Sequence, residues 1–140
     1  MSQPAATALA RLLATAGTAH FVAPQPFDAL VPRGLPGAAR TWTYVSGAAE
    51  LAVAAAVAVP RTRALGGVAA AALFTAVFPA HLQMLQDWKT KSAAHRAVAV
   101  GRLPLQLPLV AWGLRVSRQA PERSVRPGRL VRRLAGKPGA

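Results

Sequence analysis

Five polar side chains interrupt otherwise apolar stretches of this 140-residue chain and could do chemistry: His20, Glu50, His81, Arg102 and Gln106. Glutamate and arginine form ion pairs, and histidine exchanges a proton near neutral pH. A charged group in hydrocarbon costs about 2.5–3.5 kcal/mol or more, so such groups turn inward and pair. The set therefore predicts a shared buried pocket, with Glu50 and Arg102 as its ion pair.

The spacing of these residues supports a pocket built on helices. Arg102 and Gln106 are four residues apart and share one helix face, and the same holds for Ser46 and Glu50. Gly47 lies one turn from Glu50, where it would allow a neighbouring backbone to approach closely. The Glu50–Arg102 pair could equally be a structural staple that fixes helix register, without a role in binding.

Composition indicates that a membrane holds these helices. The chain is 53% hydrophobic yet carries a formal net charge of +13, and its helices lack the charged outer faces that a soluble bundle needs. We expect an all-α, integral membrane, antiparallel four-helix bundle over residues 1–117. A disordered, basic cytoplasmic tail is expected over residues 118–140. The expected helices cover residues 7–23, 42–59, 64–86 and 98–116.

The link between the first two helices contains four prolines, which prevent a continuous helix there. Its apolar Phe27, Leu30 and Val31 are compatible with a short segment lying in the membrane interface. A plain loop is an equally good interpretation of the same residues.

Antiparallel placement of the four segments puts all five polar residues at a similar depth. Counted from the outer helix ends at about 1.5 Å per residue, they fall within roughly the outer 5–12 Å of the bundle. Each helix contributes at least one of them, which again predicts one pocket in the outer half.

The distribution of Lys and Arg predicts the orientation. With a cytoplasmic N-terminus, the inner side has eleven basic residues, eight of them in the last 26 residues of the chain, against six on the outer side. We therefore expect a multi-pass protein of the inner or plasma membrane with both termini in the cytoplasm. The tail is expected to contact anionic lipid. Trp42 and Trp88 would anchor the outer interface and Trp112 the inner one.

Several other classes of protein fit the sequence less well. The basic residues follow a hydrophobic segment and are not spread over a polar face, so no nucleic-acid partner is expected. The chain has no cysteine, which excludes thiol chemistry within it. The histidines lack the spacing of metal ligands, so no metal site is predicted. A soluble four-helix protein remains an alternative, because Ala-rich apolar helices also occur in cores.

Around the five candidate pocket residues the chain resembles the DoxX-like family of small bacterial four-helix membrane proteins. The resemblance rests on short motifs in order: Gly17–Phe21, Val31-Pro32 with Leu35-Pro36, Tyr44–Glu50, Pro60–Arg63, Val77–His81 and Arg102–Gln106. It covers residues from about 10 to 117 and leaves the basic tail outside.

The resemblance implies a membrane subunit of a quinone-linked oxidoreductase or redox complex, with quinone as its ligand. In that function His20 or His81 would donate a hydrogen bond to a carbonyl, and Glu50 and Arg102 would set the charge of the pocket. The alternative is a non-catalytic scaffold that stabilises other membrane proteins. Partners would be the lipid bilayer, other membrane or redox subunits, and further copies of the chain.

Overall fold

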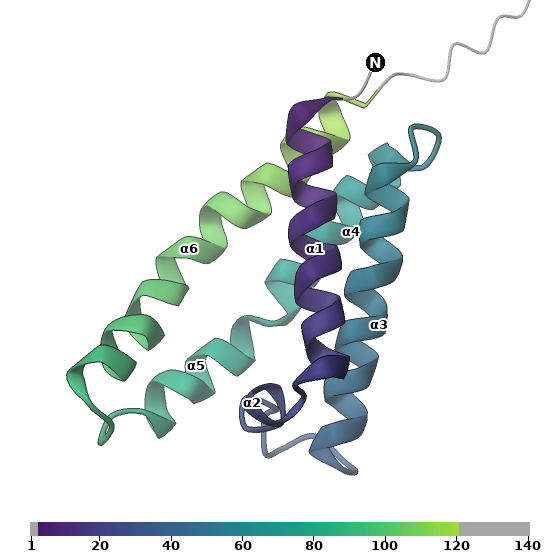
Figure 1. Ribbon diagram of the computed structural model, residues 1–140. Helices are drawn as coiled ribbons and strands as arrows, with labels where there is room; N and C mark the ends of the chain where they lie inside the picture. The colour runs from purple at the N-terminus through teal and green to yellow at the C-terminus, as the bar shows by residue number, and fades with distance from the viewer. Residues whose placement is uncertain (1–2, 121–140) are drawn as a thin grey trace, which may run out of the picture.

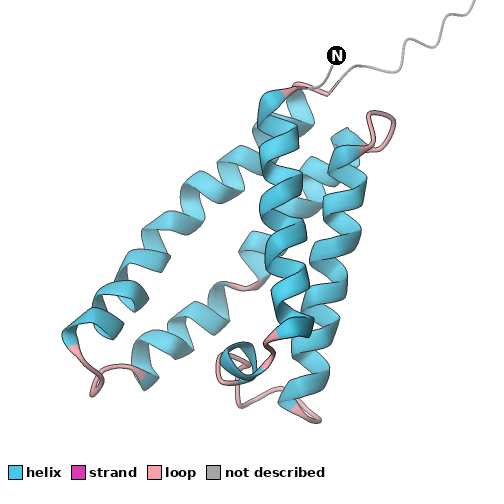
Figure 2. Cartoon of the chain, viewed as in Figure 1, coloured by secondary structure: helices cyan, strands magenta, loops and turns pink. Residues whose placement is uncertain are grey.

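The computed structural model describes residues 3–120, and all the regular structure within them is helical (Figures 1 and 2). The helices are, in chain order, α1 (Pro4–Val22), α2 (Gln25–Asp28), α3 (Ala39–Ala58), α4 (Arg63–Ala76), α5 (Phe78–Asp87) and α6 (Ala93–Arg118). The all-α prediction is confirmed.

The long helices form a chain of neighbours in which α1 packs along α3, α3 against α4, and α4 against α6. The start of α1 meets the end of α6, where the indole N–H of Trp112 donates to the backbone oxygen of Ala5 at 3.1 Å. This end of the molecule, which also carries the turn at residues 59–62, is called the terminal end (Figure 1). The opposite end carries α2, residues 29–38 and the turn at 88–92, and is called the loop end.

The hydrophobic core lies toward the terminal end. Its fully buried members come from α1, α3, α4 and α6, and include Leu9, Leu13, Val57, Ala70 and Val116. Toward the loop end α6 diverges from α1, and α5 follows α6 (Figure 1). The tight packing of the terminal end therefore does not extend along the whole bundle.

Glycines permit the closest helix contacts. A Cβ atom added to Gly67 would meet the backbone nitrogen of Ser117 at 2.5 Å and the backbone oxygen of Gly113 at 2.6 Å. These distances are far below van der Waals contact, so α4 and α6 can approach this closely only without a side chain there.

The turn between α3 and α4 is fixed by a buried arginine. Arg63 is 5% exposed, and its Nε and Nη2 atoms donate to the backbone oxygens of Val57 and Ala58, both at 3.0 Å. The hydroxyl of Thr62 donates to the oxygen of Ala56 at 2.9 Å. These side chains satisfy the last carbonyl groups of α3, which have no partner within their own helix.

The structure divides the expected helix 64–86 in two. The chain leaves α4 at Ala76, and Pro79 in the first turn of α5 has no N–H to continue the earlier hydrogen-bond ladder. The last helix begins at Ala93, earlier than expected, because the Ser92 hydroxyl accepts from the His95 N–H at its start. Between α1 and α3 the chain forms one short helix, α2, not a plain loop.

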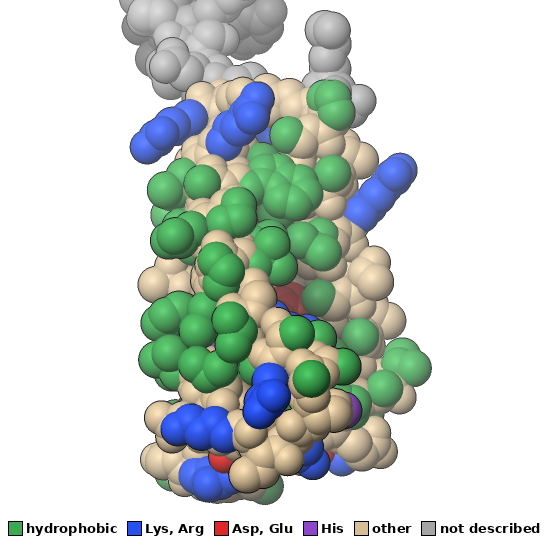
Figure 3. Space-filling view, turned by 90° about the vertical axis from the view of Figure 1, so that its left-hand side faces the viewer, with side chains coloured by type: hydrophobic (Ala, Val, Ile, Leu, Met, Phe, Trp, Pro, Cys, Tyr) green, Lys and Arg blue, Asp and Glu red, His purple; other side chains and the backbone are tan. Residues whose placement is uncertain are grey.

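Two helical stretches in the described part are long and apolar enough to cross a membrane: residues 63–87, which combine α4 and α5, and α6. Within each stretch, only 22% and 17% respectively of its apolar 18-residue window is buried, whereas a core helix of a soluble protein is mostly buried. On the face in Figure 3, hydrophobic side chains cover the middle, and most Lys and Arg side chains lie toward the two ends. These features favour association with a membrane.

Candidate functional site

The structure brings two of the five predicted pocket residues together. His20 on α1 and Glu50 on α3 face each other, with Nδ1 of His20 3.4 Å from Oε2 of Glu50. Their side chains are 9% and 13% exposed, so the pair is nearly buried.

The histidine of this pair is held on two further sides. Its Nδ1 lies 2.8 Å from the backbone oxygen of Ala16, and its ring stacks on Phe27 of α2 with centroids 3.8 Å apart. Since a backbone oxygen can only accept, Nδ1 carries the proton. Oε2 of Glu50, by contrast, is buried without a hydrogen-bond partner.

Two glycines explain how α1 and α3 come close enough to form the pair. A Cβ atom on Gly47 would meet the Cβ of His20 at 2.7 Å, and one on Gly17 would meet the backbone oxygen of Gly47 at 2.9 Å. The absence of both side chains therefore sets the separation at which His20 reaches Glu50.

The predicted Glu50–Arg102 pair is not formed. Glu50 lies within ion-pair distance of His20, whereas Arg102 is exposed on α6. The physical reason is the divergence of α6 from α1 and α3 toward the loop end, which separates the two side chains' helices (Figure 1). Nδ1 of His81, on α5, is buried without a hydrogen-bond partner.

Gln106 has a structural contact. It is 5% exposed, and its Nε2 donates to the backbone oxygen of Phe74, near the end of α4. A helix break leaves carbonyl groups unpaired, and in an apolar environment another group must satisfy them. Gln106 thus stabilises the junction between α4 and α5 from the neighbouring helix.

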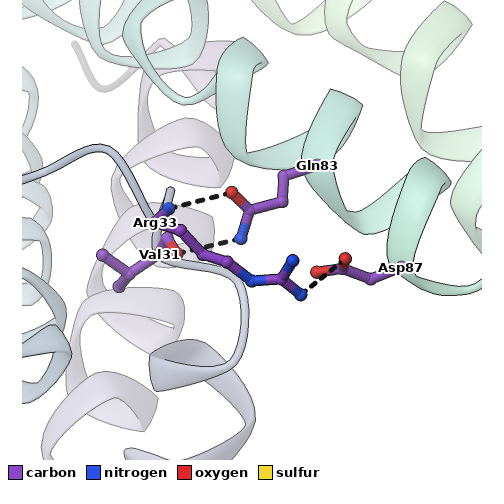
Figure 4. Close-up of polar contacts among 4 residues, drawn as sticks. All are labelled: Val31, Arg33, Gln83 and Asp87. Atoms are coloured by element: carbon purple, nitrogen blue, oxygen red, sulfur yellow. Dashed lines mark hydrogen bonds and ion pairs between the residues drawn. The ribbon is translucent and has the colours of Figure 1, made fainter.

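A second polar cluster lies at the loop end, where α5 holds the segment between α2 and α3 (Figure 4). The side-chain amide of Gln83 accepts from the N–H of Arg33 and donates to the oxygen of Val31, both at 3.0 Å. Asp87 forms an ion pair with Arg33 at 2.8 Å. These three contacts fasten the segment to one face of α5.

The end of α2 and the segment that follows it are also fastened to α3. Asp28 accepts hydrogen bonds from Arg40 at 2.8 Å and from the Thr43 hydroxyl at 2.6 Å. The hydrogen bond from Arg40, followed by that from Thr43, lowers the pKa of Asp28. The indole N–H of Trp42 donates to the oxygen of Pro36 at 2.7 Å.

These contacts frame an open pocket of about 520 Å³ between residues 28–39 and the end of α5, which we call the clasp pocket. Its polar lining consists of Asp28, Arg33, Gln83, Asp87 and Lys91, and its apolar lining includes Val31, Leu35 and Trp88. None of the five predicted pocket residues lines it.

Sequence reasoning missed the clasp pocket, although one signal was present. Gln83 and Asp87 are four residues apart and share a helix face. Their partners lie about fifty residues away in a proline-rich segment whose path no periodicity predicts.

The comparisons with known proteins correct the expected family. No curated protein and no solved structure matches the chain. A family model described as a domain of unknown function, DUF8561, matches residues 9–117. The resemblance to the DoxX-like family is therefore wrong, and the redox association inferred from it loses its basis. The matched region covers most of the chain, so the protein belongs to the DUF8561 family.

Proposed function

We propose that the protein crosses the membrane four times, through α1, α3, α4 with α5, and α6. At about 1.5 Å per residue, α1 and α3 measure about 28 and 30 Å, close to the thickness of the hydrocarbon core. Large apolar side chains are exposed on all four segments, among them Val22, Val45, Leu65 and Leu107. In a bilayer these side chains would contact lipid.

With four crossings, both termini lie on the same side of the membrane. The excess of basic residues in the tail indicates that this is the cytoplasmic side. The cysteine-free sequence permits a direct test. In intact cells, a membrane-impermeant maleimide should label Thr90→Cys, in the turn after α5, and should label Ser124→Cys only after permeabilisation. Labelling of both or neither in intact cells would refute the four-crossing topology.

Within this bundle we propose that the His20–Glu50 pair binds the polar head of an amphipathic molecule. This proposal rests on one observation: Oε2 of Glu50 is buried and accepts no hydrogen bond. Leaving such a group unsatisfied costs about 1–3 kcal/mol or more, so a purely structural pair would be expected to satisfy it. A ligand hydroxyl or amine would supply the donor, and a reduced quinone is one molecule of this class.

The experiment is native mass spectrometry of the detergent-purified protein, before and after addition of a short-chain quinol. Glu50→Gln should abolish a bound molecule that the unmodified protein retains, because the amide lacks the charge that the donor meets. Arg102→Gln is the control, since Arg102 is exposed and unpaired with Glu50. Equal loss in both variants, or an empty unmodified protein that takes up no quinol, would contradict the proposal. The second result would favour a non-catalytic membrane scaffold.

A further inference from the structure

The charges around the clasp pocket are unequal. The loop end carries two acidic residues, Asp28 and Asp87. It carries five basic residues: Arg33, Arg40, Lys89, Lys91 and Arg96. Both acids are in ion pairs at 2.8 Å, with Arg40 and Arg33 respectively. The carboxylates that line the pocket are thus neutralised, and Lys91 adds an unmatched positive charge to its wall.

Arg33 also retains hydrogen-bonding capacity. Its side chain is 79% exposed, and one guanidinium nitrogen, Nη2, contacts Asp87. Guanidinium carries five N–H donors in a planar fork that matches the oxygens of a phosphate group. The remaining donors of Arg33 and the ammonium group of Lys91 are therefore available on one pocket.

The pocket wall is held in place before any ligand arrives. Gln83 and Trp42 bond to the backbone between α2 and α3, at residues 31, 33 and 36. Asp87 holds the side chain of Arg33, and Thr43 holds Asp28 at the end of α2. A pre-formed site binds without the entropy cost of ordering a loop. Trp88 and Leu35 line the same pocket and would contact the apolar part of an amphipathic ligand.

We propose that the clasp pocket binds a phosphate group, and that its source is the headgroup of an anionic phospholipid. The site differs from the His20–Glu50 pair in position and in charge. The lipid source depends on the proposed membrane location, whereas phosphate recognition by Arg33 and Lys91 does not.

The test compares two lysines of the same turn. The full-length protein in neutral detergent is titrated with dioleoyl phosphatidylglycerol or dioleoyl phosphatidylcholine, and bound lipid is measured by native mass spectrometry. Lys91→Gln should weaken phosphatidylglycerol binding about fivefold, the usual effect of one lysine near an anionic lipid surface. Lys89→Gln removes the same charge from a residue that does not line the pocket, and should change binding less than twofold. The tail is the same in all variants, so a difference between the two lysine variants reports the pocket.

Equal effects of the two substitutions, or equal binding of the two lipids, would overturn the proposal. Both lysines are exposed, and equal melting temperatures of the variants would establish that the comparison is between folded proteins. A parallel titration with glycerol 3-phosphate separates the sources. Lys91-dependent binding of phosphatidylglycerol alone supports the lipid headgroup, whereas Lys91-dependent binding of glycerol 3-phosphate supports a soluble phosphate ester. That second result would keep the phosphate site even if the protein did not span a membrane.

Discussion

Replacing Arg63 by methionine should strongly destabilise the bundle. Arg63 is the first residue of α4, where a cation is unfavourable toward the helix dipole, so its benefit must come from elsewhere. That benefit is the pair of hydrogen bonds to Val57 and Ala58, both at 3.0 Å and formed by a 5% exposed side chain.

The expected magnitude follows from these two bonds. A hydrogen bond to a charged group contributes about 1.5–3 kcal/mol, and removal of the donor leaves buried carbonyl groups unsatisfied. The two bonds share one guanidinium and are not independent, so we expect a loss of about 3 kcal/mol. Methionine keeps much of the side-chain length, which limits the effect of lost packing.

The assay is denaturant or thermal unfolding of the purified protein in detergent, with Arg61→Met as the control. Arg61 lies two residues earlier in the same turn, is exposed, and loses the same charge on substitution. A loss of stability in Arg63→Met no larger than in Arg61→Met would refute the capping argument. It would leave both arginines as determinants of membrane topology only.

Two further outcomes are expected. Gly67→Ala should lower the melting temperature, because the added Cβ would meet the backbone oxygen of Gly113 at 2.6 Å. Gly101→Ala should be neutral or stabilising, because open space surrounds that position and alanine favours a helix over glycine by about 1 kcal/mol. Equal melting temperatures of the two variants would contradict the packing described for α4 and α6. Asp28 has a lowered pKa in the folded protein, so its stabilising contribution is present above the unfolded pKa of about 3.9 and is lost as the pH falls through the folded value. Unfolding measured from pH 6 to pH 2 should therefore show a smaller loss of stability in Asp28→Asn than in the unmodified protein, and parallel curves would exclude this role of Asp28.

The sequence predicted the helices better than the contacts between them. Apolar runs located the long helical segments, with ends displaced by a few residues where Pro4 and Ser92 begin helices early. Depth counting placed Glu50 and Arg102 in the same half of the bundle, but depth contains no information on how far two helices diverge. Because α6 leaves α1 and α3 toward the loop end, those two residues do not meet.

Short motifs predicted less of the structure than the apolar runs did. Pro60–Arg63 is typical of a basic turn at a membrane surface, yet Arg63 is buried and caps α3. Whether an arginine in a turn is free or satisfies carbonyl groups depends on the angle between the helices it joins. The same limit applies to the clasp pocket, since the partners of Gln83 depend on the path of a segment without periodicity.

The junction at Val77 has a consequence for how the loop end can move. Because α4 and α5 are separate helices, a tilt of α5 at this joint would change its packing on α6 and leave the α4–α6 contact at Gly67 and Gly113 in place. Gln83 and Asp87 tie α5 to the residues before α3, so any tilt pulls that segment along. The same segment continues from α2, whose Phe27 stacks on His20. A tilt of this ten-residue helix would thereby be passed on to Phe27, which covers His20.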